Sequence, residues 1–159
     1  MKPGSAAPPP ITNTPNAEGE KKRGDKRNTS RKTRMWHLLF WLAVIGALGT
    51  LSRYWLDGLV LRWTGEKFPW GILVVNALGC FLFGVVYPLA EERLLISGET
   101  RFIILTGFMG SFTTFSTSTF QTAEFMRDAQ WLMAGVNIIS QIVLGLICMF
   151  AGLAIGSRL

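Results

Sequence analysis

Four long stretches of this chain contain no Lys, Arg, Asp or Glu, and they constrain its fold more than any other feature. They cover residues 35–52, 68–90, 102–123 and 129–157. A helix needs about 17–25 mainly apolar residues to cross a bilayer, and each stretch reaches that length. The connections between them are short and polar, which suits neighbouring helices in a bundle. The pattern predicts an all-α membrane protein with four transmembrane helices.

The first 34 residues differ in composition from the rest of the chain. They hold nine Lys and Arg against three acidic residues, a net charge of +6, whereas residues 35–159 hold seven of each sign. This segment is rich in Pro, Asn, Ser and charged residues and has little apolar surface to bury. We therefore predict a disordered basic tail over residues 1–34 and a transmembrane domain over residues 35–159. The lipid bilayer is the expected surrounding, and no nucleic-acid partner is expected.

Charges near the helix ends give two conflicting signals on orientation. Outside the tail, the Lys and Arg residues are split almost evenly between the two sides of the membrane: Arg93, Arg101 and Arg158 on one, and Arg62, Lys67 and Arg127 on the other, with Arg53 near a helix end. Such a core has almost no positive-inside bias and is able to insert in both directions. The basic tail favours a cytoplasmic N-terminus instead.

The third uncharged stretch is polar in its middle. Residues 107–120 contain seven hydroxyl side chains and two glycines, Gly107 and Gly110. Hydroxyl groups at membrane depth are expected to face protein or a water-lined path. Glycines can loosen a helix locally and expose its backbone carbonyls. A polar helix that can be interrupted, with no ionisable group, indicates conduction of an ion without proton transfer.

Within this stretch, Phe115 stands among hydroxyl residues that include Ser116, Thr117 and Ser118. An aromatic ring has a positive edge, so a small anion can rest against its C–H groups while hydroxyls donate hydrogen bonds to it. Neutral donors can replace the hydration shell of an anion without trapping it. The alternative is that each hydroxyl bonds back to the preceding helical turn, as Ser and Thr in membrane helices commonly do.

Amide side chains mark the second and fourth stretches. Asn76 is the one strongly polar side chain in its stretch and shares a helix face with small residues such as Gly79. Its amide either links two helices or donates to a passing anion. In the fourth stretch, Asn137 and Gln141 are one turn apart and must face protein. Gly152 and Gly156 are typical of close helix packing.

Other classes of protein fit the sequence less well. A small four-helix proton-coupled exporter of dual topology needs a carboxylate inside the membrane, and none of the four stretches has one. If the chain were a non-transporting assembly subunit, the polar run in residues 107–120 would have no explanation. An enzyme is not expected, because no nucleophile–base pair is recognisable. Cys80 and Cys148 are interpreted as small core residues, and no Cys and His spacing is typical of a zinc site.

Three motifs in this order resemble the CrcB/Fluc family of fluoride channels. They are Gly46-Ala-Leu-Gly-Thr-Leu-Ser-Arg-Tyr54, Gly71-Ile-Leu-Val-Val-Asn-Ala-Leu-Gly79 and Gly107-Phe-Met-Gly-Ser-Phe-Thr-Thr-Phe-Ser-Thr117. The resemblance runs from about residue 42 to the C-terminus. It implies an antiparallel, dual-topology dimer of four-helix subunits, with the third helix broken near its middle and two fluoride pores at the interface. It also implies passive export of fluoride across the cell inner (plasma) membrane, which relieves fluoride toxicity.

The resemblance also implies roles for individual residues. Asn76 and Phe115 match the pore asparagine and the first pore phenylalanine, and Ser116 and Thr117 fall in the polar track. A structural Na+ is implied at the dimer centre, held by backbone carbonyls of residues that match Gly110 and Thr113; oxygen ligands suit a hard cation. Arg53 matches the arginine of the first helix. From the sequence alone, Arg53 is better explained as an interfacial anchor than as part of an anion vestibule.

Two positions depart from the family pattern. Ser118 occupies the place of the second pore phenylalanine, so one aromatic edge of the family pattern is missing, and the Ser118 hydroxyl is able to act as a donor instead. Ile72 stands where the family often has Thr. The partner subunit is expected to be a second copy of this chain, or an oppositely oriented paralogue if the basic tail fixes the orientation.

Overall fold

The computed structural model describes residues 17–91 and 97–159. Every regular element within these residues is a helix, which confirms the predicted all-α class for the described part. Three of the described helices are long and apolar enough to cross a bilayer, Gly19–Thr64, Trp70–Ala90 and Trp131–Gly156. The chain divides into two compact units, Met1–His37 and Leu38–Leu159.

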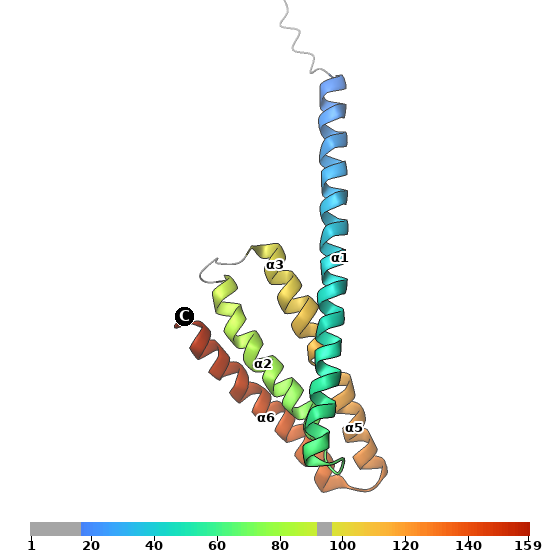
Figure 1. Cartoon of the computed structure of the whole chain (residues 1–159), viewed down its shortest axis with the longest axis vertical. Coiled ribbons are helices and arrows are strands. Elements are labelled where there is room, and N and C mark those ends of the chain that lie inside the picture. The colour runs from blue at the N-terminus through green and yellow to red at the C-terminus, as the bar shows by residue number, and fades with distance from the viewer. Residues whose placement is uncertain (1–16, 92–96) are drawn as a thin grey trace, which may run out of the picture. The chain divides into compact units, whose positions relative to one another are not determined.

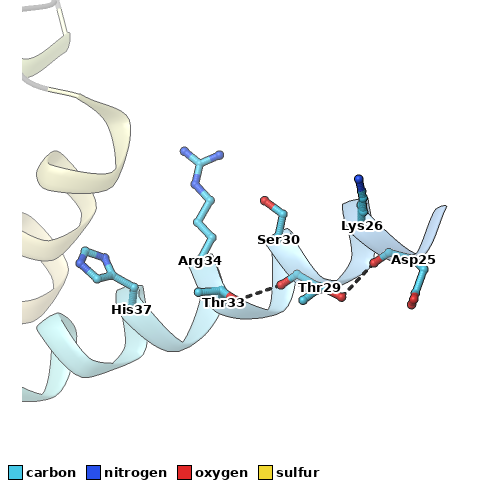
Figure 2. Close-up of a pocket in the computed structure, with 7 residues that line it drawn as sticks. All are labelled: Asp25, Lys26, Thr29, Ser30, Thr33, Arg34 and His37. Carbon is cyan, nitrogen blue, oxygen red and sulfur yellow. Dashed lines mark hydrogen bonds between the residues drawn. The ribbon is translucent and has the colours of Figure 1, made fainter. Parts of the chain in front are cut away.

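In the first unit, helix α1 (Ala17–Thr64) begins inside the basic segment. Residues 20–37 are all exposed. The hydroxyl of Thr29 donates to the Asp25 carbonyl oxygen at 2.9 Å, and that of Thr33 donates to the Thr29 carbonyl oxygen at 3.0 Å (Figure 2). These hydroxyls therefore bond to the preceding turn of their own helix.

The sequence predicts disorder over residues 1–34, and the structure differs from this over residues 17–34, which are helical. Extending an existing helix costs far less than nucleating one, and Lys and Arg are good helix formers. A charged segment without a core can therefore continue a helix that its neighbours have nucleated. Residues 1–16 lie outside the described residues.

In the second unit, α2 (Trp70–Glu91) and α6 (Trp131–Gly156) lie side by side (Figure 1). Glycines bring their backbones together: a methyl group added at Gly84 would lie 2.5 Å from the Met149 carbonyl oxygen, and one at Gly152 would overlap the Phe81 carbonyl oxygen. Gly156 is placed in the same way against Val85. The prediction that Gly152 and Gly156 are close-packing positions is confirmed.

The predicted third span is divided into several short elements. After α3 (Gly98–Phe102), a π-helical segment η1 (Ile103–Met109) and a single turn α4 (Gly110–Phe112) follow without interruption. α5 (Phe115–Arg127) begins three residues after α4 ends and packs against α6. π-helical segments are uncommon and often occur near functional sites. No single described helix therefore covers residues 102–123.

The part of α1 that belongs to the second unit packs against η1 and α4 through two glycines. A methyl group at Gly49 would lie 2.5 Å from the Phe108 carbonyl oxygen, and one at Gly46 would lie 3.2 Å from the Ser111 hydroxyl. Small residues allow two helix backbones to approach this closely in a membrane. The contacts place α1 beside the segment that leads into the gap between α4 and α5.

Candidate functional site

The gap between α4 and α5 is formed by Thr113 and Thr114, both of which have extended backbones. Their φ and ψ angles are −82° and 157° for Thr113 and −150° and 113° for Thr114. Neither residue continues the helical run that ends at Phe112 and resumes at Phe115. Backbone groups released in this way need other partners, because an unpaired one is costly where water is excluded.

Asn76 of α2 supplies these partners. Its Nδ2 donates to the Thr114 carbonyl oxygen at 3.1 Å, and the Thr114 N–H donates back to Asn76 Oδ1 at 2.8 Å. The side-chain amide therefore pairs with the backbone of Thr114 through two reciprocal hydrogen bonds. This pairing ties α2 to the gap and satisfies the N–H and the carbonyl of Thr114.

Gln141 of α6 completes the amide cluster. The second hydrogen of Asn76 Nδ2 goes to Gln141 Oε1, at 3.0 Å. The Nε2 atom of Gln141 is buried and has no hydrogen-bond partner among the described residues. Burying a donor without a partner typically costs about 1–3 kcal/mol of folding stability, so the presence of an amide at position 141 needs an explanation.

The same hydrogen bonds release two backbone carbonyls. In a regular α-helix, the Thr114 N–H would donate to the Gly110 carbonyl and the Thr117 N–H to the Thr113 carbonyl. Here the Thr114 N–H donates to Asn76, and the Thr117 N–H donates to the Thr114 hydroxyl at 3.3 Å. Gly110 and Thr113 thus each lose their regular helical donor. A cavity of about 210 Å³ lined in part by these two residues lies beside them.

Hydroxyl groups cluster at the start of α5. The Thr114 hydroxyl lies 3.2 Å from that of Ser116 and 3.0 Å from that of Thr117, and it caps α5. By contrast, the hydroxyls of Thr113, Thr119 and Thr122 bond back to the carbonyl four residues earlier. Bonding to the preceding turn therefore accounts for Thr113 and Thr119 within the polar run, whereas the hydroxyls of Thr114, Ser116 and Thr117 contact one another.

Phe115 and Ser118 are placed very differently on α5. The side chain of Phe115 is 85 % exposed, whereas Ser118 is only 7 % exposed. Ser118 faces α6, where Asn137 Nδ2 donates to its carbonyl oxygen at 3.3 Å and to the Thr122 hydroxyl at 2.8 Å. Phe115 therefore projects from the subunit next to the gap, while Ser118 belongs to the contact between α5 and α6.

The sequence predicts that Asn137 and Gln141 face protein, but it does not predict their hydrogen-bond partners. Asn137 is fully buried and joins α6 to α5, and Gln141 joins α6 to Asn76. The available signal is an amide pair one turn apart in an otherwise apolar run, which predicts burial but no particular partner. Arg53 is half-buried on α1, and the hydrogen bonds described at the gap do not include it.

The fold and the site define a helical membrane protein with an uncharged polar gap between two helices. A family model described as "CrcB-like protein, Camphor Resistance (CrcB)" matches residues 40–153. The chain therefore belongs to the CrcB family, and the resemblance drawn from its three motifs is confirmed.

Named relatives match almost their entire length to this chain. A protein of Nitrosococcus oceani is 60% identical over 121 residues, which are 76% of this chain and 97% of the relative. Proteins of Solidesulfovibrio magneticus and Maridesulfovibrio salexigens are 50% and 45% identical, over 77% and 76% of this chain and 98% and 95% of their own lengths. Each is named "Fluoride-specific ion channel FluC".

Proposed function

We propose that this protein is a passive, fluoride-selective channel and not an enzyme. The observation that carries the proposal is the Asn76–Thr114 pairing, which holds a gap in an uncharged helical segment of a chain whose relatives are named as fluoride channels. Amide, hydroxyl and backbone groups converge there without a charged residue. Such neutral donors and acceptors can lower the cost of dehydrating a small anion without holding it permanently.

The proposed channel has four membrane-spanning units in each subunit. Three are α1, α2 and α6, and the third in chain order is the run from η1 to α5, broken at Thr113 and Thr114. Two subunits assemble in antiparallel orientation, with two pores at their interface. The exposed Phe115 ring and the large apolar side chains exposed on α6, such as Ile142 and Leu146, support an assembly in which further surface is covered by protein or lipid.

The proposed fluoride path includes Asn76, Phe115, Ser116 and Thr117. The Phe115 ring offers its positive edge, and the two hydroxyl groups lie at the start of α5, where the helix dipole favours an anion. Ser118 is also proposed for the path: it is buried at the α5–α6 contact, and its hydroxyl would act as a donor in place of the missing second phenylalanine. The proposed role of Arg53 is structural, as an interfacial anchor, and a vestibule that attracts anions is the alternative.

A structural Na+ fits the backbone at the gap. The carbonyls of Gly110 and Thr113 would hold it, because the hydrogen bonds of Asn76 and of the Thr114 hydroxyl divert the N–H groups that would otherwise occupy them. When bound, the ion supplies a fixed positive charge for these carbonyl dipoles. Carbonyl oxygens are suitable ligands for a hard cation. In the proposed dimer, the two copies of this gap share one ion.

The proposed biological role is export of fluoride from the cytoplasm across the inner (plasma) membrane, which relieves fluoride toxicity. The test is fluoride release from liposomes that contain only this chain, followed with a fluoride electrode. We expect release down the fluoride gradient, without ATP, and far slower release of chloride from matched vesicles. Equal chloride release, or a strict need for a proton gradient, would contradict the proposal.

A further inference from the structure

The arginines and the lysines of residues 20–37 lie on different sides of helix α1. Every residue of this segment is helical and exposed. Each residue of an α-helix is turned by about 100° from the one before it and lies about 1.5 Å further along the axis. All the arginines of the segment therefore fall within a sector about 80° wide: Arg23, Arg27, Arg31 and Arg34. The lysines fall outside that sector: Lys21, Lys22, Lys26 and Lys32.

Three of these arginines form a stripe of like charge. Arg23, Arg27 and Arg31 follow one another at intervals of four residues, and we call them the arginine stripe. Like charges four residues apart destabilise a helix. Asp25 lies on nearly the opposite side, and Glu20 lies one turn before the first arginine, at the end of the stripe. An anion from outside the chain would therefore relieve a repulsion that the helix itself leaves largely uncompensated.

The place of the stripe in the chain favours a lipid as the source of this anion. Arg31 lies about 6 Å along the helix from Met35, the first residue of the uncharged stretch 35–52. Trp36 is 60 % exposed, and Trp is enriched at the level of the lipid headgroups. Exposed charges still attract one another over about 10 Å at 0.1 M salt. Arginines this close to a membrane span are therefore within range of headgroup phosphates.

The separation of arginine from lysine fits a phosphate partner. A guanidinium group offers a planar fork of donors that can bind two oxygens of one phosphate, whereas an ammonium group acts as a point charge. Successive members of the arginine stripe are about 6 Å apart along the axis, so each can bind a different headgroup or share one with its neighbour. The stripe therefore presents a denser array of phosphate donors than the lysine side does.

We infer that the arginine stripe is a binding site for the phosphate groups of anionic phospholipids in the leaflet next to the first membrane span. The inference goes beyond the proposed function, because the stripe takes no part in the proposed fluoride path. It also lies outside residues 40–153, which the CrcB family model matches. Binding consists of charge-assisted hydrogen bonds from the guanidinium groups to phosphate oxygens, with release of counterions.

The test measures how tightly the full chain in detergent micelles retains phosphatidylglycerol, by native mass spectrometry, with phosphatidylcholine as the reference lipid. One triple variant removes the stripe: Arg23→Gln, Arg27→Gln and Arg31→Gln. The matched control removes the same charge from the lysine side: Lys21→Gln, Lys26→Gln and Lys32→Gln. We expect the first variant to weaken retention of phosphatidylglycerol by about tenfold or more and the control to stay close to the wild type.

Gln is a good helix former, so both variants should keep the helix content and thermal midpoint of the wild type, as measured by circular dichroism. Equal weakening in the two triple variants would overturn the inference, because net charge alone would then attract the lipid. Equal retention of phosphatidylcholine and phosphatidylglycerol by the wild type would overturn it as well. If wild-type protein in phosphatidylcholine vesicles binds single-stranded RNA more tightly than it retains phosphatidylglycerol, the stripe serves a nucleic acid and the inference is wrong.

Discussion

At the residue scale, the central feature is an amide that replaces helical hydrogen bonds. Asn76 pairs with both backbone groups of Thr114, and this pairing withdraws the donor that would otherwise occupy the Gly110 carbonyl. One neutral side chain therefore both satisfies the backbone at the gap and exposes a carbonyl there. The proposed anion path and the proposed cation site thus depend on the same residue.

Asn76→Ala and Asn76→Asp test this dependence. Ala leaves the backbone groups of Thr114 without partners, and Asp adds a negative charge that repels an anion and cannot donate to the Thr114 carbonyl. We expect both variants to lose at least about tenfold in fluoride efflux, with Asp the lower. The measurement is efflux per folded dimer in liposomes, with the exposed Asn28→Ala as the control. Efflux near the wild-type rate in folded Asn76→Asp would show that this amide is not required.

The sequence predicts the importance of Asn76 but not its partners. An isolated amide in an apolar stretch must find a polar neighbour, and residues at helical spacing show which face it occupies. Whether the Asn76 amide bonds to protein or donates to an anion depends on the backbone at Thr114, which lies 38 residues further along the chain. For the same reason, Gln141 is predicted to face protein without any indication that it would bond to Asn76.

At the element scale, glycines determine how closely the helices pack. The parallel neighbours α2 and α6 approach through Gly84, Gly152 and Gly156. This is the part of the fold that the sequence predicts best, since small residues at helical spacing indicate close packing directly. The short elements η1 and α4 are harder to predict, because they depart from regular helix where they pack against α1 and α2, which local sequence does not indicate.

Gly152→Ala should destabilise the subunit, because the added methyl group would overlap the Phe81 carbonyl oxygen. Overpacking of this kind costs about 1–3 kcal/mol. Gly135→Ala is the matched control on the same helix, since a methyl group there meets no atom within 4 Å. Thermal unfolding in detergent should show a lower midpoint for Gly152→Ala only. Equal midpoints for the two variants would contradict the described packing of α2 on α6.

At the scale of the whole molecule, the proposed dimer connects the gap to subunit assembly. Gly110 is exposed, and a methyl group added there would meet only the Leu105 carbonyl oxygen, at 3.9 Å. Nothing within the subunit therefore requires a glycine at this position. The proposed shared Na+ site provides a reason outside the subunit.

Gly110→Leu is therefore expected to leave the subunit folded and to weaken the dimer and its response to sodium. For wild-type protein, replacing Na+ by a large organic cation should lower the thermal midpoint and the dimer fraction. In Gly110→Leu that difference should shrink or disappear. Thr113→Ala is the control, because it keeps the backbone carbonyl. Wild-type protein whose dimer is indifferent to Na+ would contradict the proposed site.

The basic segment, residues 1–34, affects the direction in which the chain inserts into the membrane. Nine Lys and Arg near the N-terminus favour a cytoplasmic N-terminus, whereas the almost even charges of the core permit both insertions. A homodimer requires both. Protease accessibility of the N-terminus in cells should therefore reveal two populations, and deletion of residues 1–34 should move them toward equality. A single inward population, with no efflux when the chain is expressed alone, would mean that an oppositely oriented paralogue is the partner.

The most direct test of the central claim measures whether fluoride movement is passive and carries charge. Liposomes loaded with potassium fluoride and containing only this chain should release little fluoride until a potassium ionophore is added, because charge cannot otherwise be balanced. Release should then be rapid and independent of a pH gradient, and vesicles loaded with potassium chloride should release chloride far more slowly. Fluoride release that needs a pH gradient, or chloride release at the same rate, would contradict the account.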